Sequence, residues 1–431
     1  MSDPVNATLS SRRNFLRVSS TAAASTAMAT NLSFPSVTFG KPISKKLKVG
    51  LIGCGGRGTG AAAQAMKADS NVELWALGDL FPDHIERSSQ ILQKEAGAQF
   101  NVDPIRHYTG FDAYKRVIHS GVDIVLLATP PHFRPMHMQA CIDNDKHVFV
   151  EKPVAVDATG VKQVIAAGKK AKSKGLSVVS GLCWRYETHM KDTIRRLQDG
   201  AIGDILTLES TRYTGGVGKM VERTPDMSDM EYQMRNWYYY TWLSGDFIVE
   251  QFVHELDKMS WLIGEYPESV LASGGRISRT EPKYGHIYDH FNAIFEYKSG
   301  KKYFASTRHE SGTDGTWRDH VYGTEGFCDL MKYTAKGKDS FRIKERRTVM
   351  HQIEHDEFFS ALRSGRVINN TEYMTNSTLL GIMARESAYT GKRLTWKQML
   401  ESKQNLSPSS YTWDQELTEP SVAKPGVTKF V

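Results

Sequence analysis

The sequence has 431 residues, enough for two domains and one or two segments outside them. It is 40% hydrophobic and 24% charged, which is ordinary for a globular protein, and no 18-residue run is apolar enough to span a bilayer, so we expect no stable membrane insertion. The formal net charge of +7 is spread thinly over a long chain, so we expect no nucleic-acid partner. The four cysteines form no CxxC pair and have no metal-ligand spacing, which argues against a disulfide scaffold and against a metal site.

Residues 1–29 have the features of an export signal. Ser11 to Leu16 reads SRRNFL, which matches the twin-arginine pattern SRRxFL, and an Ala/Ser/Thr-rich stretch leads to the cleavage-type sequence Ala27-Met28-Ala29. The alternative interpretation is a disordered basic tail. The pattern predicts delivery by the twin-arginine translocase to the periplasm or another extracytoplasmic compartment, a route that suits a protein that takes up a cofactor before export. Residues 30–45 are then predicted to be a linker.

A nucleotide-binding pattern follows. Residues 47–52 (LKVGLI) are rich in strand-forming residues and lead directly into a GxGxxG loop and an Ala-rich helical stretch. In such a loop Gly53 allows the tight turn, Gly55 lets the backbone approach a pyrophosphate, and Gly58 lets the helix pack closely on the strand. The candidate cofactor residues of this loop are Gly53, Gly55, Gly56, Arg57 and Gly58.

Asp79 follows a second predicted strand, 72–77, at the distance where a carboxylate binds the ribose hydroxyls of a dinucleotide. A carboxylate there repels a 2′-phosphate, and Arg57 is the one nearby basic residue that could hold such a phosphate. The pattern therefore favours NAD over NADP as cofactor.

Two further strands, 123–128 and 147–150, end in the sequences Thr-Pro-Pro-His and Glu-Lys-Pro. Because a doubly wound sheet binds ligands at the carboxyl ends of its strands, we expect these two segments to converge at the cofactor. The lysine of the second segment is either an ordinary exposed cation or a group directed at the substrate hydroxyl. The candidate cofactor residues here are Thr129, Pro130, His132, Glu151 and Lys152.

The glycine loop, TPPH and EKP, in this order and spacing, resemble the Gfo/Idh/MocA oxidoreductases. The resemblance continues through residues 178–186 (VVSGLCWRY), 202–205 and 244–262, and covers most of residues 46–395. Arg134 departs from the pattern, because relatives often carry a histidine there. The resemblance implies a doubly wound Rossmann domain, here residues 46–180, and an oxidoreductase activity.

The second half of the sequence lacks the regular alternation of strands and helices. It contains several predicted strands with few helices between them, at 205–212, 270–273, 291–297, 302–307 and 320–322. This order predicts an α+β domain over residues 181–395 with a mostly antiparallel, open sheet. Helices on one face would leave the other face free to pair with a second subunit, so we expect a homo-oligomer, a dimer or a tetramer. Residues 396–431 are predicted to be an extended C-terminal tail.

Residues 244–262 contain the candidate chemistry. On one continuous helix, Glu250, His254 and Asp257 would project from the same face. An isolated pattern of this kind is more often a polar helix face, but the family resemblance, in which this motif reads DxGxHxxD, implies that His254 is the acid/base. Glu250 and Phe252 stand where relatives have Asp and Gly. We expect His254 to take the hydroxyl proton and Lys152 to stabilise the developing alkoxide, with no metal ion required.

An aromatic segment, 232–242, precedes this block and favours either sugar stacking or a core or subunit interface. Together with the end of the first domain it supplies the candidate substrate residues Arg185, Tyr186, Asn236, Trp237 and Asp257.

The predicted function is hydride transfer between a secondary hydroxyl of a sugar, glycoside or cyclic polyol and a tightly bound nicotinamide cofactor. One alternative resembles the family 109 glycoside hydrolases, in which transient oxidation at carbon 3 permits elimination of the aglycone. Another alternative is a non-catalytic sugar sensor that keeps NAD as a structural group, against which the presence of Lys152 and His254 argues.

Overall fold

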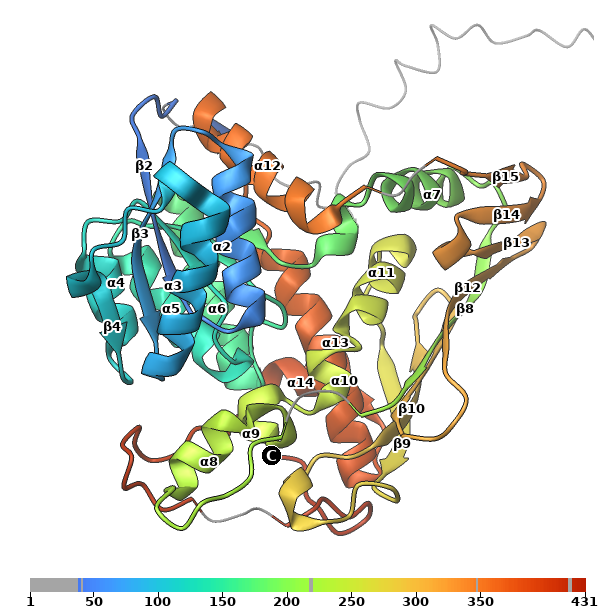
Figure 1. Cartoon of the computed structure of the whole chain (residues 1–431). Helices are drawn as coiled ribbons and strands as arrows, with labels where there is room; N and C mark the ends of the chain where they lie inside the picture. Colours follow the sequence, from blue (N-terminus) through green and yellow to red (C-terminus); the bar gives the residue numbers. More distant parts are fainter. Residues whose placement is uncertain (1–37, 40–41, 217–219, 346–347, 418–420) are drawn as a thin grey trace, which may run out of the picture. The chain divides into compact units, whose positions relative to one another are not determined.

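The computed structural model describes residues 38–39, 42–216, 220–345, 348–417 and 421–431 (Figure 1). The predicted export signal, including Arg12 and Arg13, lies outside the described residues. Within the described part of the chain, no helix combines the length and the apolar character needed to cross a membrane.

The first half contains a six-stranded, fully parallel sheet with the order β4-β3-β2-β5-β6-β7. The direction of winding reverses between β2 and β5, which is where a doubly wound sheet opens a ligand crevice. The strands are β2 (Leu47–Ile52), β3 (Val72–Asp79), β4 (His107–Thr109), β5 (Ile124–Leu127), β6 (His147–Val150) and β7 (Val178–Ser180).

Both faces of this sheet are buried, which explains the continuous apolar runs in its sequence. Ile124 and Leu126 of β5 pack with the helices of one face, α2, α3 and α12. Val125 and Leu127 pack with those of the other face, α4, α5 and α6. The helices are α2 (Gly56–Ala68), α3 (Pro82–Ala96), α4 (Ala113–His119), α5 (Arg134–Asp143), α6 (Ala158–Ser173) and α12 (Met350–Ser364). The predicted Rossmann fold is confirmed.

The second half contains a nine-stranded sheet with the order β15-β14-β13-β12-β8-β11-β10-β9-β17. Every neighbouring pair is antiparallel except β8 and β11, so the prediction of a mostly antiparallel sheet is confirmed. The strands are β8 (Ile205–Thr214), β9 (Ser269–Gly275), β10 (His290–Glu296), β11 (Lys302–His309), β12 (Thr316–Gly323), β13 (Gly326–Asp329), β14 (Thr334–Gly337), β15 (Phe341–Arg342) and β17 (Leu394–Thr395).

The central strands of this sheet alternate between buried and exposed side chains, as a half-covered sheet requires. In β10, Phe291, Ala293 and Phe295 are buried against the helices, while Asn292 and Ile294 face outward. Helix α13 contacts β9, α11 and also α6 of the first half. The helices of this half are α7 (Thr188–Gln198), α8 (Asp229–Arg235), α9 (Thr241–Ser244), α10 (Phe247–Glu250), α11 (Val253–Ile263), α13 (Thr371–Thr390) and α14 (Trp396–Glu401).

The chain returns to the first half after the second sheet is complete. Helix α12 falls in the range expected for the second domain, but Phe358 and Phe359 join the core of the Rossmann half. The short strand β16 (Arg366–Val367) pairs with β1 (Thr38–Phe39), which falls in the predicted linker. Single-turn 3₁₀ helices complete the described structure: η1 (Gly97–Gln99), η2 (Pro104–Arg106), η3 (Pro131–Phe133), η4 (Cys183–Tyr186), η5 (Trp237–Tyr239), η6 (Pro282–Tyr284) and η7 (Leu330–Lys332).

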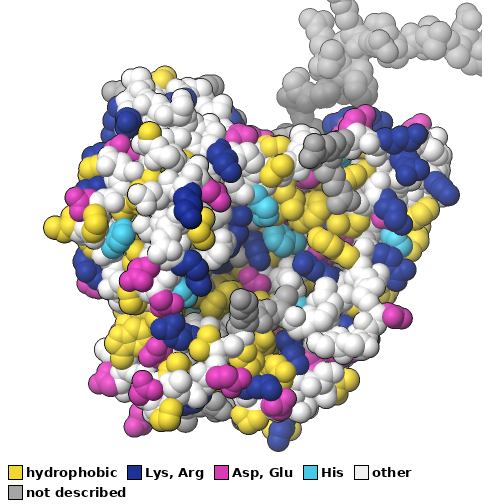
Figure 2. Space-filling model, in the orientation of Figure 1, with side chains coloured by type: hydrophobic (Ala, Val, Ile, Leu, Met, Phe, Trp, Pro, Cys, Tyr) yellow, Lys and Arg dark blue, Asp and Glu magenta, His cyan; other side chains and the backbone are white. Residues whose placement is uncertain are grey.

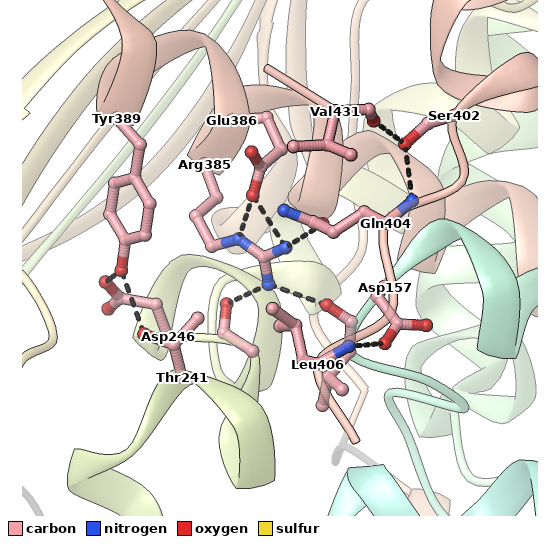
Figure 3. A network of polar contacts seen from close by, with 12 residues as sticks. Asp157, Thr241, Asp246, Arg385, Glu386, Tyr389, Ser402, Gln404, Leu406 and Val431 are labelled. Atoms are coloured by element: carbon pink, nitrogen blue, oxygen red, sulfur yellow. Dashed lines mark hydrogen bonds and ion pairs between the residues drawn. The ribbon is translucent and has the colours of Figure 1, made fainter. Parts of the chain in front are cut away.

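The predicted extended tail begins with a helix. Thr395 and Gln398 form a capping box that starts α14, and this local signal accounts for the helix there. Beyond α14 the described residues run without helix or strand over 402–417. Arg385, which is fully buried, donates hydrogen bonds to Gln404 of this segment and to the carbonyls of Val156 and Gly245 (Figure 3).

Candidate active site

The glycine loop has the geometry that a dinucleotide-binding turn requires. Gly53 has a φ of +98°, and a Cβ at that position would lie 2.6 Å from the carbonyl carbon of Ala128. A Cβ on Gly58 would lie 1.8 Å from the carbonyl oxygen of Gly53, so a side chain there would force the helix away from the strand. A Cβ added to Gly55 or Gly56 would have no atom within 4 Å, so the backbone of these two residues is open to an approaching ligand.

The loop opens onto a pocket of about 220 Å³ at the carboxyl edge of the parallel sheet. Helix α2 begins at this pocket with no acidic residue in its first turn, so its exposed N–H groups can receive a phosphate. Predicted cofactor residues that line the pocket are Gly53, Gly55, Gly56, Arg57, Gly58, Asp79, Thr129 and Pro130. The chain's own residues therefore fit a dinucleotide.

Asp79 lines this pocket, and both of its carboxylate oxygens accept hydrogen bonds from the backbone. One carboxylate oxygen accepts a hydrogen bond from the Cys54 N–H at 2.6 Å, and the other accepts from the Phe81 N–H at 3.0 Å. The second oxygen also lies 3.1 Å from Nδ1 of His84. Asp79 thus fixes the glycine loop as well as facing the pocket.

Arg57 lines the same pocket as Asp79 but forms its ion pair with another carboxylate. It is the only Lys or Arg among the described residues that line the pocket, and its Nε lies 2.7 Å from Oε1 of the buried Glu151. Its Nη2 lies 4.0 Å from Glu354 of α12. The charge of Arg57 is therefore paired with a buried carboxylate.

Lys152 and Glu250 meet although 98 positions separate them in the chain. Nζ of Lys152 donates to the backbone carbonyl of Glu250 at 2.8 Å and to its Oε1 at 3.2 Å. Both side chains are mostly buried, with 16% and 14% exposed. The preceding residue, Glu151, pairs with Arg57 of the glycine loop, so this ion pair adjoins the nucleotide pocket.

His254 lies in the first turn of α11, and its Nδ1 has no hydrogen-bond partner among the described residues. Burial holds its pKa well below the ordinary value, and the positive charges of Lys152 and Arg212 lower that pKa further. The imidazole is therefore neutral at pH 7.

The expected continuous helix through residues 250–257 is wrong. The chain breaks at Gln251 and Phe252, between α10 and α11, and Oε1 of Gln251 lies 2.6 Å from Nε2 of His309. Glu250 ends α10 and Asp257 lies in α11, so the two residues do not share one continuous helix. Asp257 instead accepts hydrogen bonds from Arg185 at 2.9 and 3.0 Å.

The predicted substrate residues are mostly used inside the protein. Arg185 and Asp257 pair with each other, and the Tyr186 hydroxyl donates to Asn370 at 2.9 Å. The amide of Asn236 bonds to the backbone of Val221 and Tyr232. These four predicted residues thus have partners inside the protein, whereas Trp237 lines the nucleotide pocket.

Arg134, the departure from the family pattern, ties two loops together. Its Nε donates to the carbonyl of Thr129 at 2.9 Å, and its Nη1 donates to the carbonyl of Pro153. Burial lowers the pKa of Arg134 to about 10, so the side chain remains charged at pH 7. It holds the TPPH segment against the EKP segment.

Sequence reasoning missed two side chains on strands β8 and β12, one of which, Arg212, bears a charge that lowers the pKa of His254. Arg212 lies 4.7 Å from the centre of the Trp317 ring, and both side chains contact the carboxylate of Glu255. Trp317 is 45% exposed, so much of this ring is open to solvent. Nothing in the local pattern of either strand marks these residues, because only sheet pairing brings Trp317 opposite Arg212.

Helix α12 contributes His351, another side chain that the sequence did not reveal. Nδ1 of His351 lies 3.4 Å from Oε1 of Glu354, and the charges of Arg57, Glu151 and Lys152 bear on the pKa of His351, which burial lowers. In the space-filling view, histidine and basic side chains gather in a hollow of the face shown, beside an apolar patch (Figure 2).

Comparison with known proteins matches both halves of the chain to one family. Residues 47–180 match the oxidoreductase family with an NAD-binding Rossmann fold, and residues 191–328 match the GFO/IDH/MocA C-terminal domain. The 2,7-anhydro-N-acetylneuraminate hydratase of Escherichia coli is 26% identical over 55% of this chain and 59% of its own length. The myo-inositol 2-dehydrogenase of Thermotoga maritima is 23% identical over 67% of this chain and 77% of its own length.

Solved structures show the same fold. The aldose-aldose oxidoreductase of Caulobacter crescentus, solved with glycerol, has a TM-score of 0.64 and 20% identity, and the match covers 81% of this chain and 100% of that one. An oxidoreductase of Thermotoga maritima has a TM-score of 0.65 and 20% identity, over 83% of this chain and 100% of that one. Because the two family models match successive segments that together span more than half of the chain, this protein belongs to the Gfo/Idh/MocA family of oxidoreductases.

Proposed function

We propose that this protein is an exported, NAD-dependent oxidoreductase that transfers a hydride between a secondary hydroxyl of a sugar, glycoside or cyclic polyol and a tightly bound cofactor. The observation that carries the proposal is the ion pair of Lys152 and Glu250, which adjoins a pocket built for a dinucleotide and whose lysine charge acts on the neutral imidazole of His254. The engagement of Arg57 by Glu151 supports NAD over NADP.

The glycine loop, the amino end of α2 and Asp79 would hold NAD, which when bound accepts the hydride from the carbinol carbon. His254 is positioned as the base, since its neutral imidazole can take the hydroxyl proton as the hydride leaves. The ammonium group of Lys152 stabilises negative charge on the same oxygen. Glu250 positions Lys152 through the two contacts of its carbonyl and carboxylate.

A carbohydrate or polyol substrate is supported by Trp317 and Arg212, since the charge of Arg212 acts on His254. Trp317 exposes an aromatic face, against which the C–H surface of a sugar ring can pack, and Arg212 offers N–H donors for hydroxyl groups. Relatives named inositol dehydrogenases and a fold neighbour named an aldose-aldose oxidoreductase support the same class.

The bound cofactor can be tested on the folded holoprotein. Denaturation should release NAD in nearly equal amount to the protein. One sugar or polyol should reduce this NAD once, and continued turnover should require a second carbonyl compound, with ping-pong kinetics because the reduced holoprotein is the intermediate. Product analysis by mass spectrometry and NMR over a panel of sugars and glycosides would identify the substrate. Absence of NAD, with no thermal shift on adding NAD or NADP, would contradict the proposal.

A second candidate function is cleavage by transient oxidation, as in the family 109 glycoside hydrolases. The sequence similarity to a protein named an anhydro-sugar hydratase favours this candidate. His351 supports it too, because elimination requires a further proton-transfer group near Lys152. Such an enzyme would release the aglycone over many turnovers with no added acceptor and no lasting reduction of NAD.

Export is proposed from the SRRNFL sequence alone. Replacing both Arg12 and Arg13 by Lys should retain the precursor in the cytoplasm, because the translocase reads the arginine pair. Cell fractionation with an antibody to the folded domain would measure this. Unchanged periplasmic recovery in a strain without the twin-arginine translocase would contradict it.

A homo-oligomer is proposed from the uncovered face of the nine-stranded sheet. Leu271, Ile294 and Phe304 stand in register across β9, β10 and β11, and each is between 38% and 41% exposed. An apolar row of this kind on an open sheet is suited to burial against a second subunit.

A further inference from the structure

We propose that residues 402–417, here called the C-terminal strap, retain the cofactor by holding together the loops around the nucleotide pocket. The residues that do this are Tyr411 and Trp413. The inference rests on the proposed function, because the pocket must bind NAD for the strap to retain it.

The first part of the strap is fixed to the amino end of α6. Nζ of Lys162 donates to the carbonyl of Ser402 at 2.6 Å, and the Thr159 hydroxyl donates to the carbonyl of Gln404 at 2.7 Å. The Leu406 N–H donates to Oδ2 of Asp157 at 2.8 Å. Figure 3 shows this last bond, together with the bond from Arg385 to Gln404. These bonds hold the start of the strap on the Rossmann half.

The second part of the strap reaches the loops of the nucleotide pocket. The Tyr411 hydroxyl lies 2.7 Å from Nε2 of His132, and its ring centre lies 5.6 Å from that of Phe133. The ring of Trp413 lies 5.0 Å from Phe111 and 5.8 Å from Phe81. Both strap residues therefore contact side chains of the pocket loops.

The three phenylalanines come from three different loops. Phe81 follows β3, Phe111 follows β4 and Phe133 follows β5, and all three line the nucleotide pocket. Because these loops leave the same edge of a parallel sheet, moving them apart would open the pocket. The rings of Tyr411 and Trp413 together contact all three loops, so they oppose that movement.

Retention of this kind suits a protein that works where free NAD is not supplied. An ordinary dehydrogenase must let its cofactor leave on each cycle, whereas an exported enzyme loses its activity with the cofactor.

The test compares cofactor exchange in variants of the full-length holoprotein. Tyr411→Ala combined with Trp413→Ala should exchange bound NAD with isotopically labelled NAD at least about tenfold faster than the parent, since each aromatic contact contributes roughly a factor of two to ten. The matched control is Trp396→Ala, which removes a ring stacked on Tyr266 at 5.0 Å, and neither of these residues lines the pocket. The control should exchange NAD at the parental rate.

A second measurement uses the parent protein and does not depend on a variant that folds. If the strap retains NAD, NAD must stabilise the docked strap to the same extent, because coupling between two binding events is reciprocal. Hydrogen exchange over residues 402–417 should therefore be slower in the holoprotein than after NAD removal.

The outcomes separate the two proposals. If the parent holds NAD but the double variant exchanges it at the parental rate, or if strap protection is the same with and without NAD, the strap inference is wrong and the proposed function stands. Equal acceleration in Trp396→Ala would also overturn the inference. A parent that holds no NAD refutes the proposed function, and the inference with it.

Discussion

Replacing Lys152 or His254 by Ala is expected to lower the rate of hydride transfer by about 10²- to 10⁴-fold, the usual contribution of a positioned acid or base. NAD should stay bound, because neither residue lines the nucleotide pocket. Rapid-mixing measurement of nicotinamide reduction in the holoprotein would give the rate. Glu250→Gln should cost less, since Lys152 keeps its 2.8 Å bond to the backbone carbonyl of residue 250.

The pH dependence of the parent checks the role of His254 separately. The active base is the neutral imidazole, and burial with neighbouring positive charge lowers its pKa below 6.5. Because its pKa is lowered, the base stays neutral at more acidic pH than an ordinary histidine. We therefore expect kcat/KM to stay constant as the pH falls to 6.5 and to decrease only below pH 6.5. In His254→Ala, the remaining activity should not show this decrease of kcat/KM at acidic pH.

A suitable control for the lysine is Lys174→Ala. Lys174 is 27% exposed and pairs with Asp145 at 2.6 Å, so the change removes a comparable ion pair away from the site. Its rate should equal that of the parent. Losses smaller than about tenfold at both Lys152 and His254 would reject the assignment.

Gly58→Ala is expected to destabilise the protein and to abolish NAD binding, whereas Gly55→Ala should affect only NAD binding. The new Cβ at position 58 would lie 1.8 Å from a backbone oxygen, so the loop must move, at a cost of about 3 kcal/mol. The new Cβ at position 55 meets nothing within 4 Å, and the φ of −69° there suits alanine. It would instead occupy the space that the cofactor pyrophosphate needs.

Thermal unfolding of the NAD-free proteins and titration calorimetry with NAD separate the two effects. Gly58→Ala should lower the Tm of the NAD-free protein, and Gly55→Ala should leave that Tm unchanged while weakening NAD binding at least about tenfold. Parental NAD affinity in Gly55→Ala would show that the loop does not cradle a phosphate.

The sequence predicted the nucleotide half well because its signals are local. The strand 47–52, the glycine loop and the helix after it are contiguous, and each glycine has a distinct steric reason that the structure displays at Gly53 and Gly58. Lys152 could be named as a candidate for the same reason, since it follows a strand whose carboxyl end faces the ligand crevice.

Long-range pairing decided what the local pattern could not. Arg185 and Asp257 carry the charges expected of substrate residues, but they neutralise each other across 72 positions. The helix expected over 250–257 is interrupted at Gln251, whose side chain finds a partner in His309 on β11. The spacing of the residues within 244–262 gives no information about a contact with a residue on a distant strand.

The sequence by itself determined the two folds and the glycine loop with Asp79, whereas the roles of Lys152 and His254 in the reaction stay predictions. The folds and the loop each depend on residues within one motif or on an apolar pattern that only one kind of sheet satisfies. The tertiary structure alone decided that Glu250 contacts Lys152, that Arg212 lies over the ring of Trp317, and that Tyr411 lies against His132. These contacts join residues that are 98, 105 and 279 positions apart, and such distances are closed only when the sheets and helices have packed.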